Sequence, residues 1–301
     1  MSGELRAKMR FKIDWGSLAP LRLRARVLAE GVYAGSHRSA RRGAGVEFGG
    51  HRPYVPGDDL RWLDRRSLLR HDHLLVREFE TETDRALRLC LDATASMAYR
   101  GSRAPASKLA FAALVAAALA RVSVTSGDPF GCALIGGSAR GLPVSGGREA
   151  FERLVGTLEA LEATGDGARD GQLLDAGVGA IARSARRGSA IVVLSDLLDL
   201  GPKAPELVAA MAMRGRALVV LEVLDPDELD FPFEETTRLR SLEGGVEVEC
   251  DGAARERYLA ALARSRNAWT SALLSKNGRL VRASTADEPV LVVRAILDAL
   301  R

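Results

Sequence analysis

The clearest pattern along the chain is a series of short apolar runs separated by segments with helical periodicity. The two strongest runs, 189–194 and 217–224, are almost continuously apolar. Such runs are expected of central strands that are covered by helices on both faces. Because each run is separated from the next by a helical pattern, the sequence predicts an α/β fold with a doubly wound, mostly parallel sheet.

This alternation begins at residue 86 and continues to the end of the chain. Further strands are predicted at 86–91, 130–135, 245–250 and 278–282, and helices at 108–124, 148–162, 172–186, 204–213, 253–274 and 288–300. We therefore expect a Rossmann-like domain over residues 86–301.

The first 85 residues have a different pattern. Leu and Val recur at helical spacing over 21–32, and a Gly- and Ser-containing stretch at 35–39 ends that pattern. Beyond residue 45 the chain is rich in turn residues, and 74–82 alternates as a half-exposed strand does. Residues 1–85 are therefore expected to form a basic N-terminal helix followed by a β and loop layer.

Three features of the sequence indicate the cellular compartment of the protein. Cys90, Cys132 and Cys250 are odd in number and far apart, a pattern that indicates neither a disulfide framework nor a zinc site. The longest apolar run, 109–120, ends at Arg121 and is shorter than the roughly 20 residues of a membrane-spanning helix. The N-terminus lacks the apolar core of a signal peptide. We expect a cytoplasmic protein without a membrane span.

The net charge of +4 has an uneven distribution, because residues 1–42 hold 10 Lys and Arg against 3 Asp and Glu. An arginine-rich segment can bind nucleic acid, an acidic partner or an anionic membrane, and it can equally be a solvated helix face. No interleaved aromatic residues or known reader motif accompany it. Nucleic-acid binding through this segment is therefore a lesser alternative.

Candidate ligand-binding side chains follow two of the predicted strands. Ligands of doubly wound sheets bind at the carboxyl ends of strands, where the strand order reverses. Asp92, Thr94 and Ser96 follow the first strand of the domain, and Asp196 follows the 189–194 strand. Their carboxylate and hydroxyl oxygens suit Mg²⁺ or Mn²⁺. In the alternative interpretation, the carboxylates cap helices and the hydroxyls satisfy the turn backbone, and spacing alone does not separate the two.

The loop Asp92-x-Thr94-x-Ser96 resembles the DxSxS metal-ion-dependent adhesion motif of von Willebrand factor A domains, with Thr94 in place of the first serine. Asp196 resembles the aspartate of their third metal loop. Their second loop has a threonine, but here the nearest one, Thr164, comes too early. Asp170 is then a substitute oxygen ligand, or Arg169 replaces the cation electrostatically. The resemblance implies a von Willebrand factor A-like domain with a degenerate metal site.

The segment before this domain resembles the GxEFxxxRxYxPGDDxRxxDW signature of the bacterial family called domain of unknown function 58, although Arg65 stands where the signature ends in Trp. The matching residues are Glu47, Phe48, Arg52, Tyr54, Gly57, Asp58, Asp59, Arg61 and Asp64. This resemblance extends over roughly residues 20 to 260. It implies a partner or adaptor of a MoxR-type AAA+ ATPase that acts in the assembly or maturation of client proteins.

The first functional hypothesis is therefore a non-catalytic binding protein. The alternative is a metal-assisted hydrolase, in which a cation on Asp92 and Asp196 activates water and Asp58, Asp59 or His51 serves as base. No phosphate-binding GxxxxGK[ST] loop, GxSxG elbow or HExxH motif occurs in the sequence. We do not expect an enzyme.

Overall fold

The computed structural model describes residues 11–13, 21–35, 47–53, 75–80, 86–167, 170–198, 200–233, 237–242 and 247–301. The chain divides into two units, of which one combines Met1–Ser36 with Arg85–Arg301 and the other is His37–Asp84. Helix α1 (Leu21–Gly35) therefore groups with the α/β unit and not with the β and loop layer, a difference from the division expected at residue 85. The described part of the smaller unit is the antiparallel pair β2 (Glu47–Pro53) and β3 (Leu75–Glu80).

The larger unit is built on a six-stranded sheet in the order β12-β9-β8-β4-β5-β6. These strands are β4 (Leu87–Ala93), β5 (Phe130–Gly136), β6 (Leu142–Ser145), β8 (Ala190–Ser195), β9 (Ala217–Leu224) and β12 (Arg279–Ser284). All neighbours pair in parallel except β5 and β6. The chain adds β5 and β6 on one side of β4 and β8, β9 and β12 on the other. The predicted doubly wound, mostly parallel α/β sheet is confirmed.

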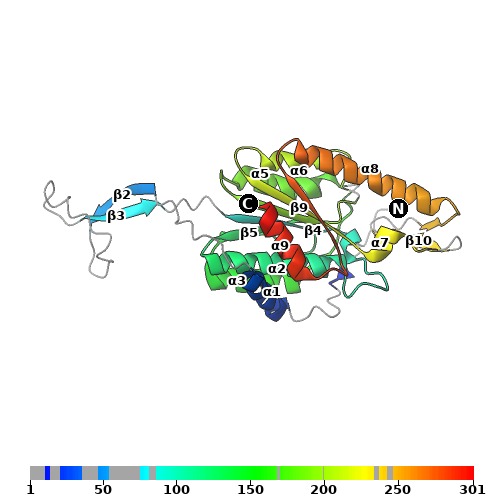
Figure 1. The fold of residues 1–301 in the computed structure, drawn as a ribbon, viewed down its shortest axis with the longest axis horizontal. Helices are drawn as coiled ribbons and strands as arrows, with labels where there is room; N and C mark the ends of the chain where they lie inside the picture. Colours follow the sequence, from blue (N-terminus) through cyan, green and yellow to red (C-terminus); the bar gives the residue numbers. More distant parts are fainter. Residues whose placement is uncertain are drawn as a thin grey trace, which may run out of the picture. The chain divides into compact units, whose positions relative to one another are not determined.

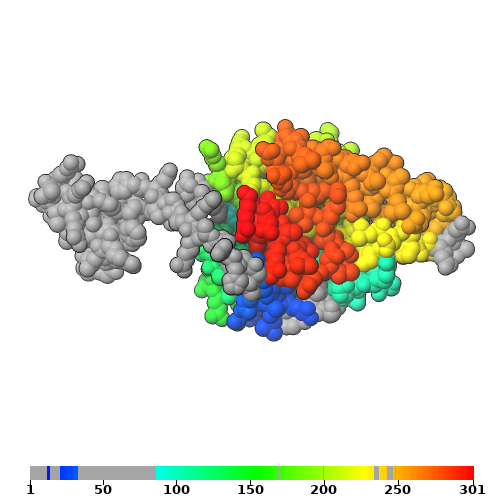
Figure 2. All heavy atoms as spheres, viewed as in Figure 1, coloured from blue at the N-terminus to red at the C-terminus, as the bar shows by residue number. Residues whose placement is uncertain are grey.

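Two apolar layers cover the sheet because successive side chains of each strand point to opposite faces. Leu89 and Leu91 of β4 pack into one layer, and Cys90 packs into the other. The first layer contains α1, α2 (Lys108–Ser126), α3 (Gly147–Glu159) and α9 (Pro289–Ala299) (Figure 1). Figure 2 shows α1, in blue, against α9, in red, and Arg294 of α9 donates to the Gly31 carbonyl at 2.5 Å.

The second layer contains a helical segment, α6 (Ala204–Ala209) with its short continuation η6 (Ala210–Ala212), and α8 (Ala254–Leu274). The helical segment runs from α4 (Gly171–Leu174) through the π turn η5 (Asp175–Gly179) to α5 (Ala180–Ser184). The helix predicted at 172–186 is therefore present, but a π turn interrupts its hydrogen-bond pattern.

Helix α2 is the central helix of the first layer and is apolar on all sides. It begins after Ser107, whose hydroxyl caps the Ala110 N–H at 3.2 Å, and it ends at the left-handed Gly127. By length and composition it could cross a membrane, but 72% of its apolar window is buried inside the protein. An all-round apolar surface is what a helix enclosed by a sheet and other helices requires.

The remaining elements lie outside the main sheet. They are the antiparallel pairs β1 (Phe11–Lys12) with β7 (Glu162–Ala163) and β10 (Arg238–Arg240) with β11 (Glu247–Glu249), the 3₁₀ turn η4 (Ala95–Ala98) and the short helix α7 (Pro226–Asp230). The strand predicted at 245–250 is thus part of a separate pair. The antiparallel edge strand β6 was not predicted.

Candidate functional site

The candidate site lies at the carboxyl ends of β4 and β8, where the strand order reverses. Asp92 of β4 is fully buried there. Its Oδ1 accepts hydrogen bonds from the Thr94 N–H at 2.9 Å and the Thr94 hydroxyl at 2.7 Å, and its Oδ2 accepts from the Ser195 hydroxyl at 2.5 Å. Burial and the nearby charge of Asp196 raise the pKa of Asp92 to about 6, although these hydrogen bonds act in the opposite direction.

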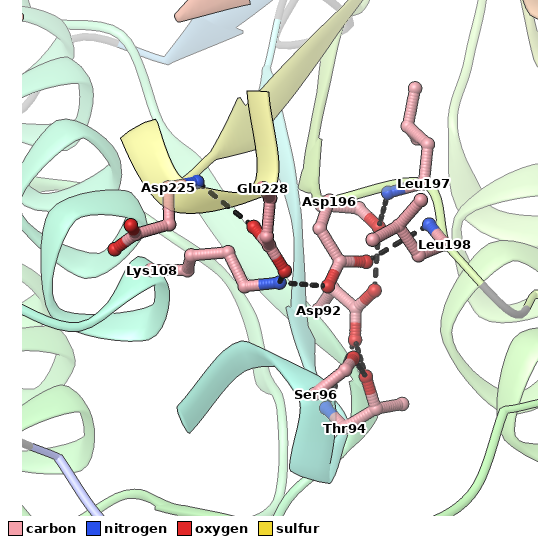
Figure 3. A network of polar contacts seen from close by, with 10 residues as sticks. Asp92, Thr94, Ser96, Lys108, Asp196, Leu197, Leu198, Asp225 and Glu228 are labelled. Carbon is pink, nitrogen blue, oxygen red and sulfur yellow. Dashed lines mark hydrogen bonds and ion pairs between the residues drawn. The ribbon is translucent and has the colours of Figure 1, made fainter. Parts of the chain in front are cut away.

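Two hydroxyl groups face this carboxylate from the turn that follows β4. The Thr94 Oγ1 lies 3.1 Å from the Ser96 Oγ. Thr94 is buried, whereas Ser96 is half-buried and brings the cluster closest to solvent. In Figure 3, Asp92 lies between this pair of hydroxyls and Asp196. The sequence prediction that these four side chains come together is consistent with this geometry.

A buried lysine, which the sequence analysis did not single out, completes the cluster. The Lys108 Nζ donates to Asp196 Oδ2 at 2.7 Å and to Glu228 Oε1 at 2.6 Å (Figure 3). The Lys108 side chain is only 1% exposed. Burial disfavours its charged form, but Asp196 and Glu228 together outweigh burial and raise the pKa of Lys108 above its ordinary value. The ammonium is therefore an internal cation at the end of the sheet.

Glu228 is held in place by the capping box of α7. One of its oxygens, Oε2, accepts from the Asp225 N–H at 2.9 Å, which leaves Oε1 for Lys108. Asp225 Oδ2 accepts from the Gly101 N–H at 2.8 Å, and Asp227 Oδ1 accepts from the Arg103 Nε at 2.9 Å. These bonds tie the loop before α2 to α7, so the two elements that supply Lys108 and Glu228 are fixed together.

The charges of this cluster do not balance. Asp92, Asp196 and Glu228 are three buried or nearly buried carboxyl groups, and among the described residues Lys108 pairs with two of them, Asp196 and Glu228. Burial, together with the nearby charge of Asp196, raises the pKa of Asp92, and burial also raises the pKa of Glu228. A site with excess buried carboxylates favours an additional proton or an additional cation.

The family model described as "Protein of unknown function DUF58" matches residues 50–268. This chain belongs to the DUF58 family. Uncharacterized proteins of Mycobacterium tuberculosis and Mycobacterium bovis are 31% identical to it over 254 residues, which are 83% of this chain and 78% of each relative.

Two solved structures are also similar to this DUF58 protein. The conserved hypothetical protein BatB from Bacteroides thetaiotaomicron has 17% sequence identity and a TM-score of 0.46, with 72% of this chain and 98% of that chain covered. An aerotolerance-related membrane protein from Bacteroides fragilis has 20% identity and a TM-score of 0.45, with the same coverage.

Other predicted residues of the DUF58 chain lie elsewhere. Asp170 is exposed, and its Oδ1 accepts from the Gln172 N–H at 3.1 Å, so its carboxylate caps α4. Arg169 lies outside the described residues. Thr164 comes too early in the sequence to match the threonine of the second metal loop. It nevertheless lies beside the end of β4, because its N–H donates to the Ala93 carbonyl at 2.9 Å. Its buried hydroxyl has no hydrogen-bond partner among the described residues.

Of the family signature, three residues fall within β2, and the structure describes their backbone; they are Glu47, Phe48 and Arg52. The others lie outside the described residues; they are Tyr54, Gly57, Asp58, Asp59, Arg61 and Asp64. Within the described residues, no three His, Cys, Asp or Glu side chains are grouped as a metal site. Any cation here would therefore depend on hydroxyl oxygens as well as carboxylates.

Proposed function

We propose that this DUF58 protein is a non-catalytic adaptor whose von Willebrand factor A-like domain binds a partner through a degenerate metal-ion-dependent adhesion site. The observation that carries the proposal is the acidic cluster at the strand reversal, where Lys108 pairs with two carboxylates and no described basic side chain pairs with Asp92. Ligands of doubly wound sheets bind at this position. The half-buried Ser96 marks the solvent side of the cluster.

The chemistry of the cluster fits a weakly bound, hydrated Mg²⁺ or Mn²⁺. Mg²⁺ commonly binds through one or two carboxylates and retains several waters. Asp92, Thr94, Ser96 and Asp196 would supply the oxygen ligands, and the unpartnered hydroxyl of Thr164 lies beside the same strand end. The cation would present a positive charge to a carboxylate of the partner. Lys108 already supplies part of that charge, so we expect weak affinity.

Asp170 is not included in this proposed ligand set, because it is exposed and caps α4. The hydrolase alternative has less support than the adaptor. Asp92 and Asp196 are fully buried, and their oxygens accept bonds from hydroxyl groups, backbone N–H groups and Lys108. A general base must reach the proton it removes, but Asp58 and Asp59 lie outside the described residues and His51 belongs to β2 of the smaller unit, so the described structure places none of the three beside these carboxylates.

The proposed partner is a MoxR-type AAA+ ATPase, with the client protein as the third member of the assembly, in the cytoplasm. The DUF58 signature in the sequence supports this partner. A partner carboxylate near the Ser96 side of the cluster would gain from charge complementarity, which contributes to orientation and to the association rate.

The proposal is tested by pull-down of the full chain with a MoxR-type ATPase, with Mg²⁺ and with EDTA. We expect association of the wild type to increase with Mg²⁺ and this increase to disappear in Asp92→Asn. Asp170→Asn is the matched control, because it removes one carboxylate that the structure places in a helix cap, where Asn serves equally well. It should behave as the wild type does.

Electron paramagnetic resonance of added Mn²⁺ measures cation binding to the chain in the absence of the partner. If association is unchanged by Mg²⁺ and by Asp92→Asn, the adaptor function is supported and the role of the cation is contradicted. If the two proteins associate under none of these conditions, the proposed adaptor function is contradicted.

A further inference from the structure

A second charged region lies at the opposite end of the sheet from the acidic cluster. A hollow of about 640 Å³ opens beside the amino ends of β8 and β9. Its lining consists of five arginines, one alanine and one glycine, namely Arg183, Ala185, Arg186, Arg187, Arg214, Gly215 and Arg216. None of these residues is acidic or aromatic. The arginines come from the end of α5 with the turn before β8, and from the turn before β9.

Hydrogen bonds between the two turns hold this hollow in a fixed shape. The Gly188 N–H donates to the Gly215 carbonyl at 2.9 Å, and the Ala217 N–H donates to the Ser189 carbonyl at 3.1 Å. The side chain of Arg187 lies directly over Gly215, because a Cβ at that glycine would be 3.2 Å from the Arg187 Cγ. The two turns that carry the arginines are therefore held next to each other by backbone hydrogen bonds.

Two of the arginines that line the hollow have no carboxylate partner in the described part of the chain. Arg187 and Arg214 form no ion pair with a described carboxylate. Arg216 donates through Nη2 to the Ala182 carbonyl at 3.3 Å, but its buried Nε–H has no hydrogen-bond partner among the described residues. Burial and the neighbouring charge of Arg214 lower the pKa of Arg216. The adjacent Arg88 has a lowered pKa for similar reasons, namely burial and the charges of Arg186 and Arg216.

We propose that this arginine hollow binds a ligand that carries two or more linked phosphate groups. Guanidinium groups form paired hydrogen bonds with phosphate oxygens, and several of them in one hollow require a multivalent anion for neutralisation. The volume lies within the range of small-ligand sites, about 300 to 1,000 Å³. Because no aromatic residue lines the hollow, a base would lack a stacking surface there. The hollow therefore recognises phosphate and not nucleobase.

Inorganic pyrophosphate is the probe that tests this site, by isothermal titration calorimetry on the full chain. We expect saturable binding that becomes weaker by about tenfold or more in Arg187→Ala/Arg214→Ala. Arg187→Lys/Arg214→Lys keeps the charge but loses the forked donors, so its affinity should fall between the two. Arg24→Ala/Arg26→Ala removes the same charge from the exposed face of α1 and should change affinity by no more than about twofold.

Vesicles of phosphatidylglycerol distinguish a lipid source of the phosphate from a soluble one. Co-sedimentation that the hollow variant loses and pyrophosphate competes away would assign the phosphate to lipid headgroups, whereas pyrophosphate binding without co-sedimentation would assign it to a soluble ligand. Thermal unfolding without ligand confirms that each variant is folded. The proposal is overturned if wild type binds neither probe, or if the α1 variant loses binding as the hollow variant does.

Discussion

The two ends of the central sheet carry opposite charges in opposite structural settings. At the carboxyl end, Lys108 is 1% exposed and its carboxylate partner Asp196 is fully buried. At the amino end, Arg187 and Arg214 are exposed and line an open hollow. The strand β8, with six residues, separates the two regions by roughly 20 Å. The charges at one end are therefore part of the core, whereas those at the other end are available to a ligand.

This difference determines what each charged residue contributes to folding. A buried ion is costly without its partner, so removal of one member of a buried pair affects the whole domain. An exposed charge is solvated, and its removal leaves little behind. The four predictions that follow test this contrast, from the largest expected effect to the smallest.

Replacement of the internal cation should have the largest effect. Lys108→Met keeps an unbranched side chain of similar length but leaves Asp196 and Glu228 without their ammonium. We expect the free energy of unfolding, measured by urea denaturation, to fall by about 3–5 kcal/mol. The control is Arg26→Met, which breaks the exposed Arg26–Glu30 pair and should lower the free energy of unfolding far less, because both groups are solvated. A loss below about 1 kcal/mol in Lys108→Met would contradict a structural role for these buried ion pairs.

The second-largest effect should be the pH dependence of the free energy of unfolding that Asp92 causes. It is measured in EDTA on the metal-free protein. The pKa of Asp92 is raised from 3.8 to about 6 in the folded state, so the folded chain binds the proton more tightly than the unfolded chain does. The stability of the wild type relative to Asp92→Asn is therefore highest below pH of about 4 and declines as the pH rises through about 6. The total decline is on the order of 2–3 kcal/mol.

An exposed carboxylate provides the control of opposite sign. Asp251 bonds to Arg257, which lowers the pKa of Asp251. Its contribution is present at neutral pH and is lost as the pH falls, so the comparison of wild type with Asp251→Asn should have the reverse slope. Parallel slopes for the two aspartates would contradict the contrast between buried and exposed groups.

The crowded packing of the acidic end gives the third prediction. A Cβ at Gly101 would lie 2.3 Å from both Asp225 Oδ1 and Asp227 Oδ2, so Gly101→Ala must displace the carboxylates that tie this loop to α7. We expect a loss of about 1–3 kcal/mol in the free energy of unfolding. Gly156→Ala is the matched control, because Gly156 lies in α3 with open space around it, and the alanine should stabilise the helix by up to about 1 kcal/mol. Equal effects of the two alanines would contradict this account.

Local sequence patterns predicted the elements whose own apolar residues indicate that they are buried. The continuous apolar runs of β8 and β9 indicate central strands, and α2 contains an unbroken apolar run over 109–120. Edge strand β6 has four residues, contains Pro143 and is only partly buried, so it has no such pattern. The π turn in the 172–186 helix depends on tertiary packing of Gly177 against β5, to which a helical period is insensitive.

The candidate site shows the same division. Asp92, Thr94 and Ser96 belong to one turn, so their spacing could be recognised, and Asp196 follows a strong strand. Lys108 and Glu228 are separated by 120 positions in the chain, and a lone lysine at the start of an apolar helix has the pattern of an ordinary helix terminus. Their ion pair exists only because α2 and α7 meet at the carboxyl end of the sheet. The sequence did contain one indication of a buried cation: it brought the carboxylates of Asp92 and Asp196 together without a basic partner.

Removal of charge from the arginine hollow should have the smallest effect on stability. Arg187→Ala/Arg214→Ala eliminates two exposed guanidinium groups that make no ion pair with a described carboxylate. We expect the free energy of unfolding to stay within about 0.5 kcal/mol of wild type, and to rise slightly at low salt because like charges are removed. Added pyrophosphate should raise the melting temperature of the wild type but not of this variant, since a ligand stabilises only the state that binds it. A loss above about 2 kcal/mol without ligand would show that these arginines stabilise the end of α5, and the two ends of the sheet would then be alike in their dependence on charge.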